Sequence, residues 1–153
     1  MCYHSLMRID VISKSKNRKI VIEHLVKFYA KRLKLLKSQY TLSVISTPKF
    51  LKQHGFDGAV YLIDDRELVM MLDSRLTVAD LIKTTAHEMI HVKQYARGQL
   101  KSRSTRTGKI NYIWMGTQCS KRYYDRPWEI EAFSRERLLY NQVLRRCFPT
   151  LDK

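Results

Sequence analysis

Residues 84–92 read Thr84-Thr85-Ala86-His87-Glu88-Met89-Ile90-His91-Val92 and contain the most informative pattern in the chain. Residues four positions apart lie on one face of an α-helix, so the imidazoles of His87 and His91 can reach one metal ion. Glu88 follows the first histidine directly, where its carboxylate can touch a metal-bound water rather than the metal. This spacing predicts a metal site on a helix. The alternative is a helix on which both histidines only pack or cap.

The flanking sequence places this pattern in the middle of one helix. Thr77-Val78-Ala79-Asp80 resembles a capping box with aspartate in place of the usual glutamate, which predicts a helix start near Val78. Gly98, after Arg97, is the expected end, because glycine is favoured just past a helix C-terminus. The broad, mostly apolar face of this helix consists of Leu81, Ile82, Thr85, Met89, Ile90 and Val92.

Two histidines do not complete a catalytic zinc site, which takes three protein ligands and leaves a fourth position for water. The other histidines, His4, His24 and His54, all precede the pattern. His24 falls within a predicted basic helix and His54 precedes Gly55, so both are expected at the surface or at a cap. A carboxylate downstream of His91 is therefore the expected third ligand.

A second helix is predicted to begin at Pro127, because proline is favoured at the first helical position. Its apolar residues recur at helical spacing and are Trp128, Ala132, Phe133, Leu138, Leu139 and Val143. The third ligand is expected to be a glutamate of this helix, with Glu129 and Glu131 as candidates. Asp125, just before the helix, is expected to cap it or to hydrogen-bond a ligand histidine.

The histidine pair followed by a helix with Glu129-x-Glu131-Ala132 resembles the glutamate-ligand zincins, or gluzincins. It is most similar to the small ImmA/IrrE-like and SprT-like metallopeptidases, many of them encoded by phages and bacteria. The resemblance implies that Zn²⁺ is held by His87, His91 and Glu129, with Glu131 as the rival third ligand. It also implies that Glu88 is the general base.

The chain departs from this pattern at two points. Phe133 follows Ala132, where the related families usually place Asp or Asn. The hydrogen bond that such a residue would make to a metal ligand, its outer hydrogen-bonding role, is therefore expected to be unfilled. SprT-like enzymes commonly use a third histidine, and no histidine follows His91. The resemblance implies a zinc-dependent metallopeptidase acting on a protein or peptide substrate. The alternative is a non-catalytic, basic nucleic-acid-binding or phage accessory protein with a vestigial metal site.

The predicted elements form an α+β domain of minimal zincin-like type that spans residues 1–153, since this length suits one core. In order they are a helix over 16–37, a strand over 40–46, a hairpin of 59–63 and 67–72, the metal helix, a basic segment over 98–126 and the glutamate helix. The small sheet is expected to be mainly antiparallel. The edge of the hairpin is expected to pair with an extended substrate.

Composition indicates a cytoplasmic protein, in the host cytoplasm if it is viral. No apolar run is long enough to cross a bilayer, and the first ten residues lack the features of a secretory signal. Cys2, Cys119 and Cys147 are odd in number and far apart, which favours free thiols in a reducing compartment.

The charge of the chain is strongly positive, with 29 Lys and Arg against 14 Asp and Glu and a formal net charge of +15. Such an excess is typical of proteins that associate non-specifically with nucleic acid or another polyanion. The polar segment 101–109, with Arg103, Arg106 and Lys109, is a candidate contact surface. The alternative is a solvated surface that only aids solubility.

Aromatic residues concentrate between the two metal-bearing helices, namely Tyr112, Trp114, Tyr123, Tyr124 and Trp128. Most are expected to line the core or the walls of the site. One of the tyrosines is a candidate hydrogen-bond donor to the oxyanion that forms during peptide hydrolysis.

Overall fold

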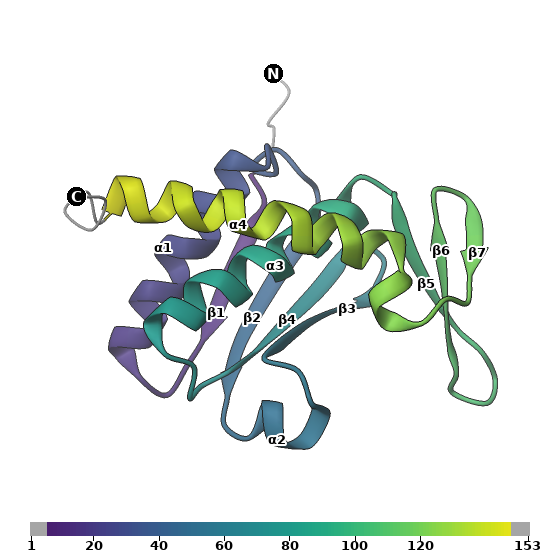
Figure 1. Ribbon diagram of the computed structural model, residues 1–153, viewed down its shortest axis with the longest axis horizontal. Helices are drawn as coiled ribbons and strands as arrows, with labels where there is room; N and C mark the ends of the chain where they lie inside the picture. The colour runs from purple at the N-terminus through teal and green to yellow at the C-terminus, as the bar shows by residue number, and fades with distance from the viewer. Residues whose placement is uncertain (1–5, 148–153) are drawn as a thin grey trace.

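The computed structural model describes residues 6–147, so Cys2 and His4 lie outside the described residues. Its elements follow the order shown in Figure 1: β1 (Arg8–Ile12), α1 (Lys16–Arg32), β2 (Thr41–Thr47), α2 (Phe50–His54), β3 (Gly58–Asp64), β4 (Glu67–Asp73), α3 (Val78–Ala96), β5 (Leu100–Ser104), β6 (Ile110–Trp114), β7 (Thr117–Cys119), the 3₁₀ helix η1 (Tyr123–Asp125) and α4 (Pro127–Cys147). This is the predicted α+β class.

The larger sheet has the strand order β1-β2-β4-β3 and is mixed. β1 pairs with β2 and β2 with β4 in parallel, whereas β3 and β4 are antiparallel. The expectation of a mainly antiparallel sheet is therefore wrong for this sheet. One cause is the unpredicted strand β1, because the crossover through α1 returns the chain in the same direction. The other is the parallel pairing of β2 with β4, two predicted strands between which α2 and β3 lie in the sequence. β3 remains at one edge of the sheet.

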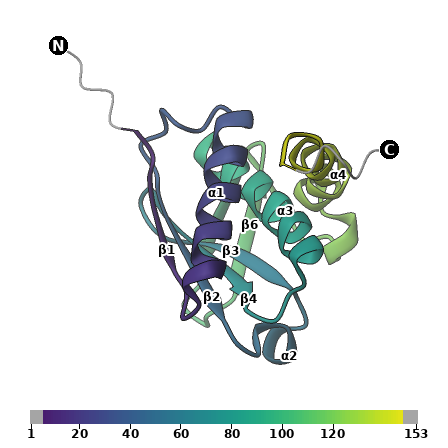
Figure 2. The same ribbon diagram turned by 90° about the vertical axis from the view of Figure 1, so that its left-hand side faces the viewer.

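Helices α1 and α3 cover one face of this sheet, and α4 packs on the far side of α3 (Figure 2). Alternate residues of β2 are buried, so one face of the sheet contributes to the core. The core joins Leu42, Val44, Leu68, Met70 and Leu72 of the sheet to Ile22, Val26, Tyr29 and Met89 of the helices. Because α3 lies between the sheet and α4, its middle is buried on every side.

The predicted limits of α3 and the predicted start of α4 are confirmed. The Thr77 hydroxyl accepts a hydrogen bond from the Asp80 backbone N–H at 3.2 Å, and α3 begins at Val78. Gly98 follows its end with φ +68°, a conformation that favours glycine. α4 begins at Pro127, as predicted.

α1 ends at Arg32, earlier than predicted. The chain turns at Lys34, whose φ is +57°, and this turn buries both Leu33 and Leu35. Two residues two positions apart cannot both face the core from one continuous helix, so the two leucines favour the turn.

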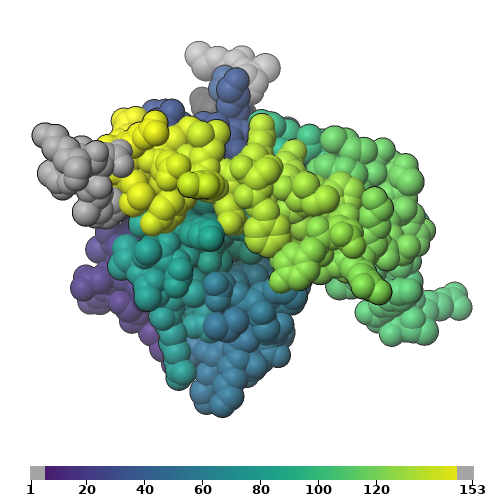
Figure 3. All heavy atoms as spheres, viewed as in Figure 1, coloured from purple at the N-terminus to yellow at the C-terminus, as the bar shows by residue number. Residues whose placement is uncertain are grey.

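The basic segment after α3 forms a second, antiparallel sheet, β5-β6-β7. Its β5–β6 hairpin turns through Gly108 and projects from the body of the molecule (Figure 3). Among residues 6–147, no helix combines the length and the apolar character needed to cross a membrane.

Gly58 begins β3 at a point where the strand touches both β4 and α3. A Cβ atom there would lie 3.0 Å from the Met71 carbonyl oxygen and 3.0 Å from Thr84 Cγ2. Gly58→Ala should lower the free energy of unfolding by about 1–3 kcal/mol, measured by urea denaturation, because the carbonyl belongs to the β3–β4 ladder. Adding Thr84→Ser removes one contact and should restore only part of the loss. An unchanged free energy in Gly58→Ala would contradict this close packing.

Candidate metal centre

Three buried side chains from two helices converge on one point. His87 and His91 lie one turn apart on α3, with their Nε2 atoms 3.2 Å from each other. From α4, the Glu129 carboxylate places Oε2 3.0 Å from His87 Nε2 and Oε1 3.2 Å from His91 Nε2. One ligand atom from each residue lies within 4.8 Å of the other two. Two imidazole nitrogens and a carboxylate oxygen form a donor set that suits Zn²⁺.

The start of α4 brings Glu129 to this point. The carbonyl of Arg126 accepts hydrogen bonds from the backbone N–H groups of Glu129 and Ile130, both at 3.0 Å, which close the first turn. Gln94 of α3 donates from Nε2 to the Trp128 carbonyl at 2.9 Å. This hydrogen bond links the first turn of α4 to α3.

Two outer hydrogen bonds orient the imidazoles. His87 Nδ1 lies 2.7 Å from Glu136 Oε2, and His91 Nδ1 lies 2.8 Å from Gln94 Oε1. A proton on each Nδ1 leaves Nε2 as the atom that faces Glu129. Neither partner was predicted, although Glu136 follows Glu129 by seven positions and so shares its helix face. Gln94 follows His91 by three positions, the spacing of neighbours on a helix.

Phe133 occupies the position at which the related families place a polar residue. Its ring packs against the His87 ring, with 4.6 Å between centroids. The outer hydrogen-bonding role is nevertheless filled, because the Glu136 carboxylate, one turn later on α4, contacts His87. The expectation of an unfilled role is therefore wrong.

The carboxylates around the cluster favour the protonated form of its histidines. Burial alone lowers the pKa of His87, but hydrogen bonds to Glu129 and Glu136 outweigh burial and raise this pKa to about 10. Burial raises the pKa of Glu129, but hydrogen bonds from His87 and His91 bring it down to about 2. A metal ion that binds these groups must displace protons, so metal binding should weaken as the pH falls.

Glu88 lies beside the cluster without joining it. Its side chain lines two adjoining hollows, the first shared with His91 and Glu129 and the second with His87. Burial is the main cause that raises the pKa of Glu88, while the two histidines oppose the rise. A carboxylate with a raised pKa in a cleft is suited to accept and return a proton.

Glu131, the rival third ligand, points away from the histidines. Its Oε1 lies 2.5 Å from Lys93 Nζ and 3.1 Å from Gln94 Nε2. Lys93 is only 2% exposed, so Glu131 neutralises a buried ammonium group. The structure therefore brings Glu129, and not Glu131, to the histidine pair.

The remaining candidates lie apart from the cluster. Arg126, rather than Asp125, directly precedes α4, and within the described chain no hydrogen bond joins the Asp125 side chain to a histidine. His24 is exposed on α1, and His54 ends α2 with its ring 4.6 Å from that of Phe50. Both positions agree with the predicted surface roles.

Of the three tyrosines considered, only Tyr123 shares both hollows with Glu88. Burial, followed by the charges of Glu129 and Glu88, raises its pKa. Tyr112 lines only the first hollow, and Tyr124 is 75% exposed against Phe133. A role in oxyanion stabilisation remains a prediction, for which Tyr123 is the best placed.

One wall of the first hollow is formed by Gly58–Tyr61 of the edge strand β3. The expectation that the hairpin provides a sheet edge beside the metal helix is therefore confirmed. Pairing of a substrate with that edge remains a prediction.

Comparisons of the chain with protein-family models, with curated proteins and with solved structures found no match. A function for this chain is therefore inferred from its own residues.

Glu129→Ala should weaken zinc binding by more than about a hundredfold, because even residues that only support a metal ligand typically contribute about 10–100-fold. A competition titration with a chromophoric chelator measures the affinity. The matched control is the double variant Lys93→Met/Glu131→Gln, which removes the rival carboxylate without leaving an unpaired buried charge. Its zinc affinity should equal that of the unchanged protein. A similar loss in both variants would mean that Glu131 is a ligand.

Proposed function

We propose that this protein is a zinc-dependent metallopeptidase with a minimal zincin-like fold, in which His87, His91 and Glu129 hold the ion. The observation that carries this proposal is the convergence of the three buried donors, with Glu88 beside them in an open cleft. The proposal needs both the three donors and the cleft, because a purely structural zinc site is closed by four protein ligands and leaves no position for water. The order of a small sheet, a metal helix and a glutamate helix also supports it.

The chemistry follows from the roles of the side chains. A bound Zn²⁺ lowers the pKa of water and polarises the scissile carbonyl. Glu88 accepts the proton of the attacking water and returns it to the leaving amine, and its raised pKa suits both transfers. Glu136 and Gln94 hold the imidazoles in place through Nδ1. Tyr123 can donate a hydrogen bond to the oxygen that becomes negative.

The substrate in this proposal is an extended peptide. An edge strand presents backbone N–H and C=O groups that a peptide can pair with, and β3 runs along the cleft beside Glu88. Pairing there would hold the peptide backbone next to the three metal-binding side chains.

A second candidate function, non-specific association with nucleic acid, is favoured by one surface. Three adjoining concavities along α1, α3 and α4 share Lys34, and no acidic side chain lines any of them in the described part of the chain. We call this surface the basic face. Its cationic residues are Lys27, Lys31, Arg32, Lys34, Lys37, Arg66, Arg97, Arg135 and Arg146. This function would remain if the metal site were vestigial.

Glu88→Gln should abolish peptide hydrolysis and leave zinc binding and the fold intact. Glutamine preserves the shape of the side chain but cannot accept the proton from water. Zinc content by elemental analysis and turnover of a quenched fluorescent peptide library give the two readouts. Retained hydrolysis, or loss of zinc from this variant, would show that the role of Glu88 is assigned wrongly.

The basic face, rather than the β5–β6 hairpin, should dominate any contact with DNA. Lys27→Gln/Lys31→Gln/Lys34→Asn should reduce the slope of log affinity against log salt by about one unit per charge that contacts a phosphate. Asparagine is chosen at position 34 because it tolerates a positive φ. Fluorescence anisotropy at several salt concentrations measures the slope.

The matched control for this experiment is Arg103→Gln/Arg106→Gln/Lys109→Gln, which removes the same charge from the hairpin. This control should change the slope less than the basic-face variant does. A larger effect from the hairpin would move the contact to residues 101–109. If the unchanged protein does not bind DNA at low salt, association with nucleic acid is rejected.

A further inference from the structure

Arg126 is held in the first hollow by aromatic rings. Its guanidinium carbon lies 5.1 Å from the centre of the Tyr112 ring, 5.7 Å from that of Trp128 and 5.9 Å from that of Tyr123. Its Nε donates to the Lys121 carbonyl at 3.3 Å. Contacts of this kind order an arginine side chain before any ligand arrives.

The guanidinium has no carboxylate partner within residues 6–147, where every ion pair joins other groups. Arg126 is also the sole lysine or arginine among the described residues that line this hollow. The two carboxylates there are Glu129, which is bonded to the histidines, and Glu88. The terminal nitrogens of Arg126 therefore remain able to bind a carboxylate with two parallel hydrogen bonds.

The walls of the hollow strengthen such an interaction. Three aromatic rings and one aliphatic side chain line the first hollow, namely those of Tyr95, Tyr112, Trp128 and Leu100. Water is partly excluded beside these groups, so the attraction between a guanidinium and a carboxylate is larger than at an open surface.

The second hollow has the opposite charge. Asp57, Asp80 and Glu136 line it, and its one lysine or arginine in the described chain, Lys83, lies 3.7 Å from Glu136. A peptide carboxylate is therefore attracted to the Arg126 end of the cleft and repelled from the other end.

We propose that the first hollow is a substrate subsite in which Arg126 binds a carboxylate of the peptide. The inference rests on the proposed function, because it takes the metal centre and Glu88 as the point of cleavage. It adds a substrate class, namely peptides with a carboxylate close to the scissile bond.

Two sources of the carboxylate correspond to two directions of the peptide. The chain passes from Asp57 in the second hollow to Ala59–Tyr61 in the first, so β3 runs toward Arg126. A peptide antiparallel to β3 would bring an acidic side chain on the N-terminal side of the cleaved bond to Arg126. A parallel peptide would bring its C-terminal carboxylate.

The test uses zinc-loaded protein with Glu88→Gln and three short peptides that carry a neutral fluorophore. One has an internal glutamate and an amidated C-terminus, the second has only a free C-terminal carboxylate, and the third has neither. At physiological salt, one carboxylate peptide should bind about tenfold to a hundredfold more tightly than the neutral one. The peptide that does so identifies the source. Equal binding of all three would overturn the proposal without any arginine variant.

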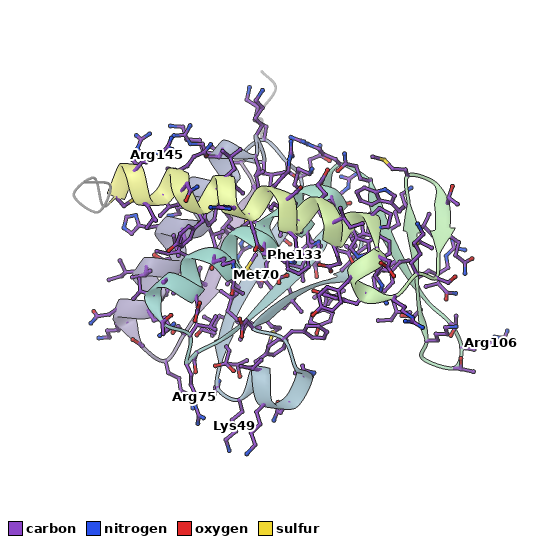
Figure 4. All side chains as sticks on the ribbon, in the orientation of Figure 1. Lys49, Met70, Arg75, Arg106, Phe133 and Arg145 are labelled. Atoms are coloured by element: carbon purple, nitrogen blue, oxygen red, sulfur yellow. The ribbon has the colours of Figure 1, made fainter. Side chains whose placement is uncertain are left out.

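The arginine variants locate the effect. Arg126→Met should remove the preference for a carboxylate, and Arg126→Lys, which keeps the charge but not the planar fork, should retain only part of it. The matched control is Arg106→Met, which removes one charge at the tip of the β5–β6 hairpin, far from the cleft (Figure 4). It should leave the preference unchanged. If Arg106→Met and Arg126→Met reduce the preference equally and Arg126→Lys does not reduce it, overall charge explains the preference and the subsite is rejected.

The failure of the proposed function would look different. If the protein with its native Glu88 hydrolyses none of the peptides, but Arg126 still confers the preference, the peptidase proposal fails and the carboxylate subsite stands. If hydrolysis occurs with no preference among the peptides, the peptidase proposal stands and the subsite fails.

Discussion

The need to pair polar groups inside the α3–α4 interface governs the structure. The middle of α3 is buried on all sides, yet it carries His87, Glu88, His91, Lys93 and Gln94. Buried polar groups without partners cost stability, and an unpaired buried charge costs more. α4 provides partners for His87, His91, Lys93 and Gln94. These partners are the carboxylates of Glu129, Glu131 and Glu136 and the Trp128 carbonyl. A shift of α4 by one turn would break all of these pairs at once. The same contacts therefore fix both the register of the two helices and the geometry of the cluster.

Features that depend on local sequence could be predicted, whereas features that depend on distant segments could not. The limits of α3 and the start of α4 follow from Thr77, Gly98 and Pro127, each of which acts on its own neighbours. Strand β1 has a single buried residue, Val11, and exists because β2 pairs with it, so its short sequence carries little signal. The parallel pairing of β1 with β2 came with that missed strand, whereas the parallel pairing of β2 with β4 joins two predicted strands that are distant in the sequence.

The same distinction holds within the candidate site. His87, His91 and Glu88 could be recognised from spacing within one helix. The choice of Glu129 over Glu131 depended on a resemblance, and in the structure it follows from Lys93, which pairs with Glu131. Glu136 was missed because its role requires the crossing of two helices, although its spacing from Glu129 was visible in the sequence. Arg126 was predicted only as the last residue of the basic segment 98–126, since its ring contacts join segments that meet only in the fold.

In the proposed function, the metal centre and part of the substrate subsite belong to different segments of the chain. All three proposed metal ligands and Glu88 belong to α3 and α4, whereas Leu100 and Tyr112, on the far wall of the first hollow, belong to β5 and β6. None of the hydrogen bonds described above between α3 and α4 involves that sheet, so changes in it would reshape the hollow and affect the α3–α4 pairing only through Trp128, whose ring packs against Tyr112 and Trp114. The proposed peptidase could then diverge in substrate preference over generations without passing through an inactive ancestor.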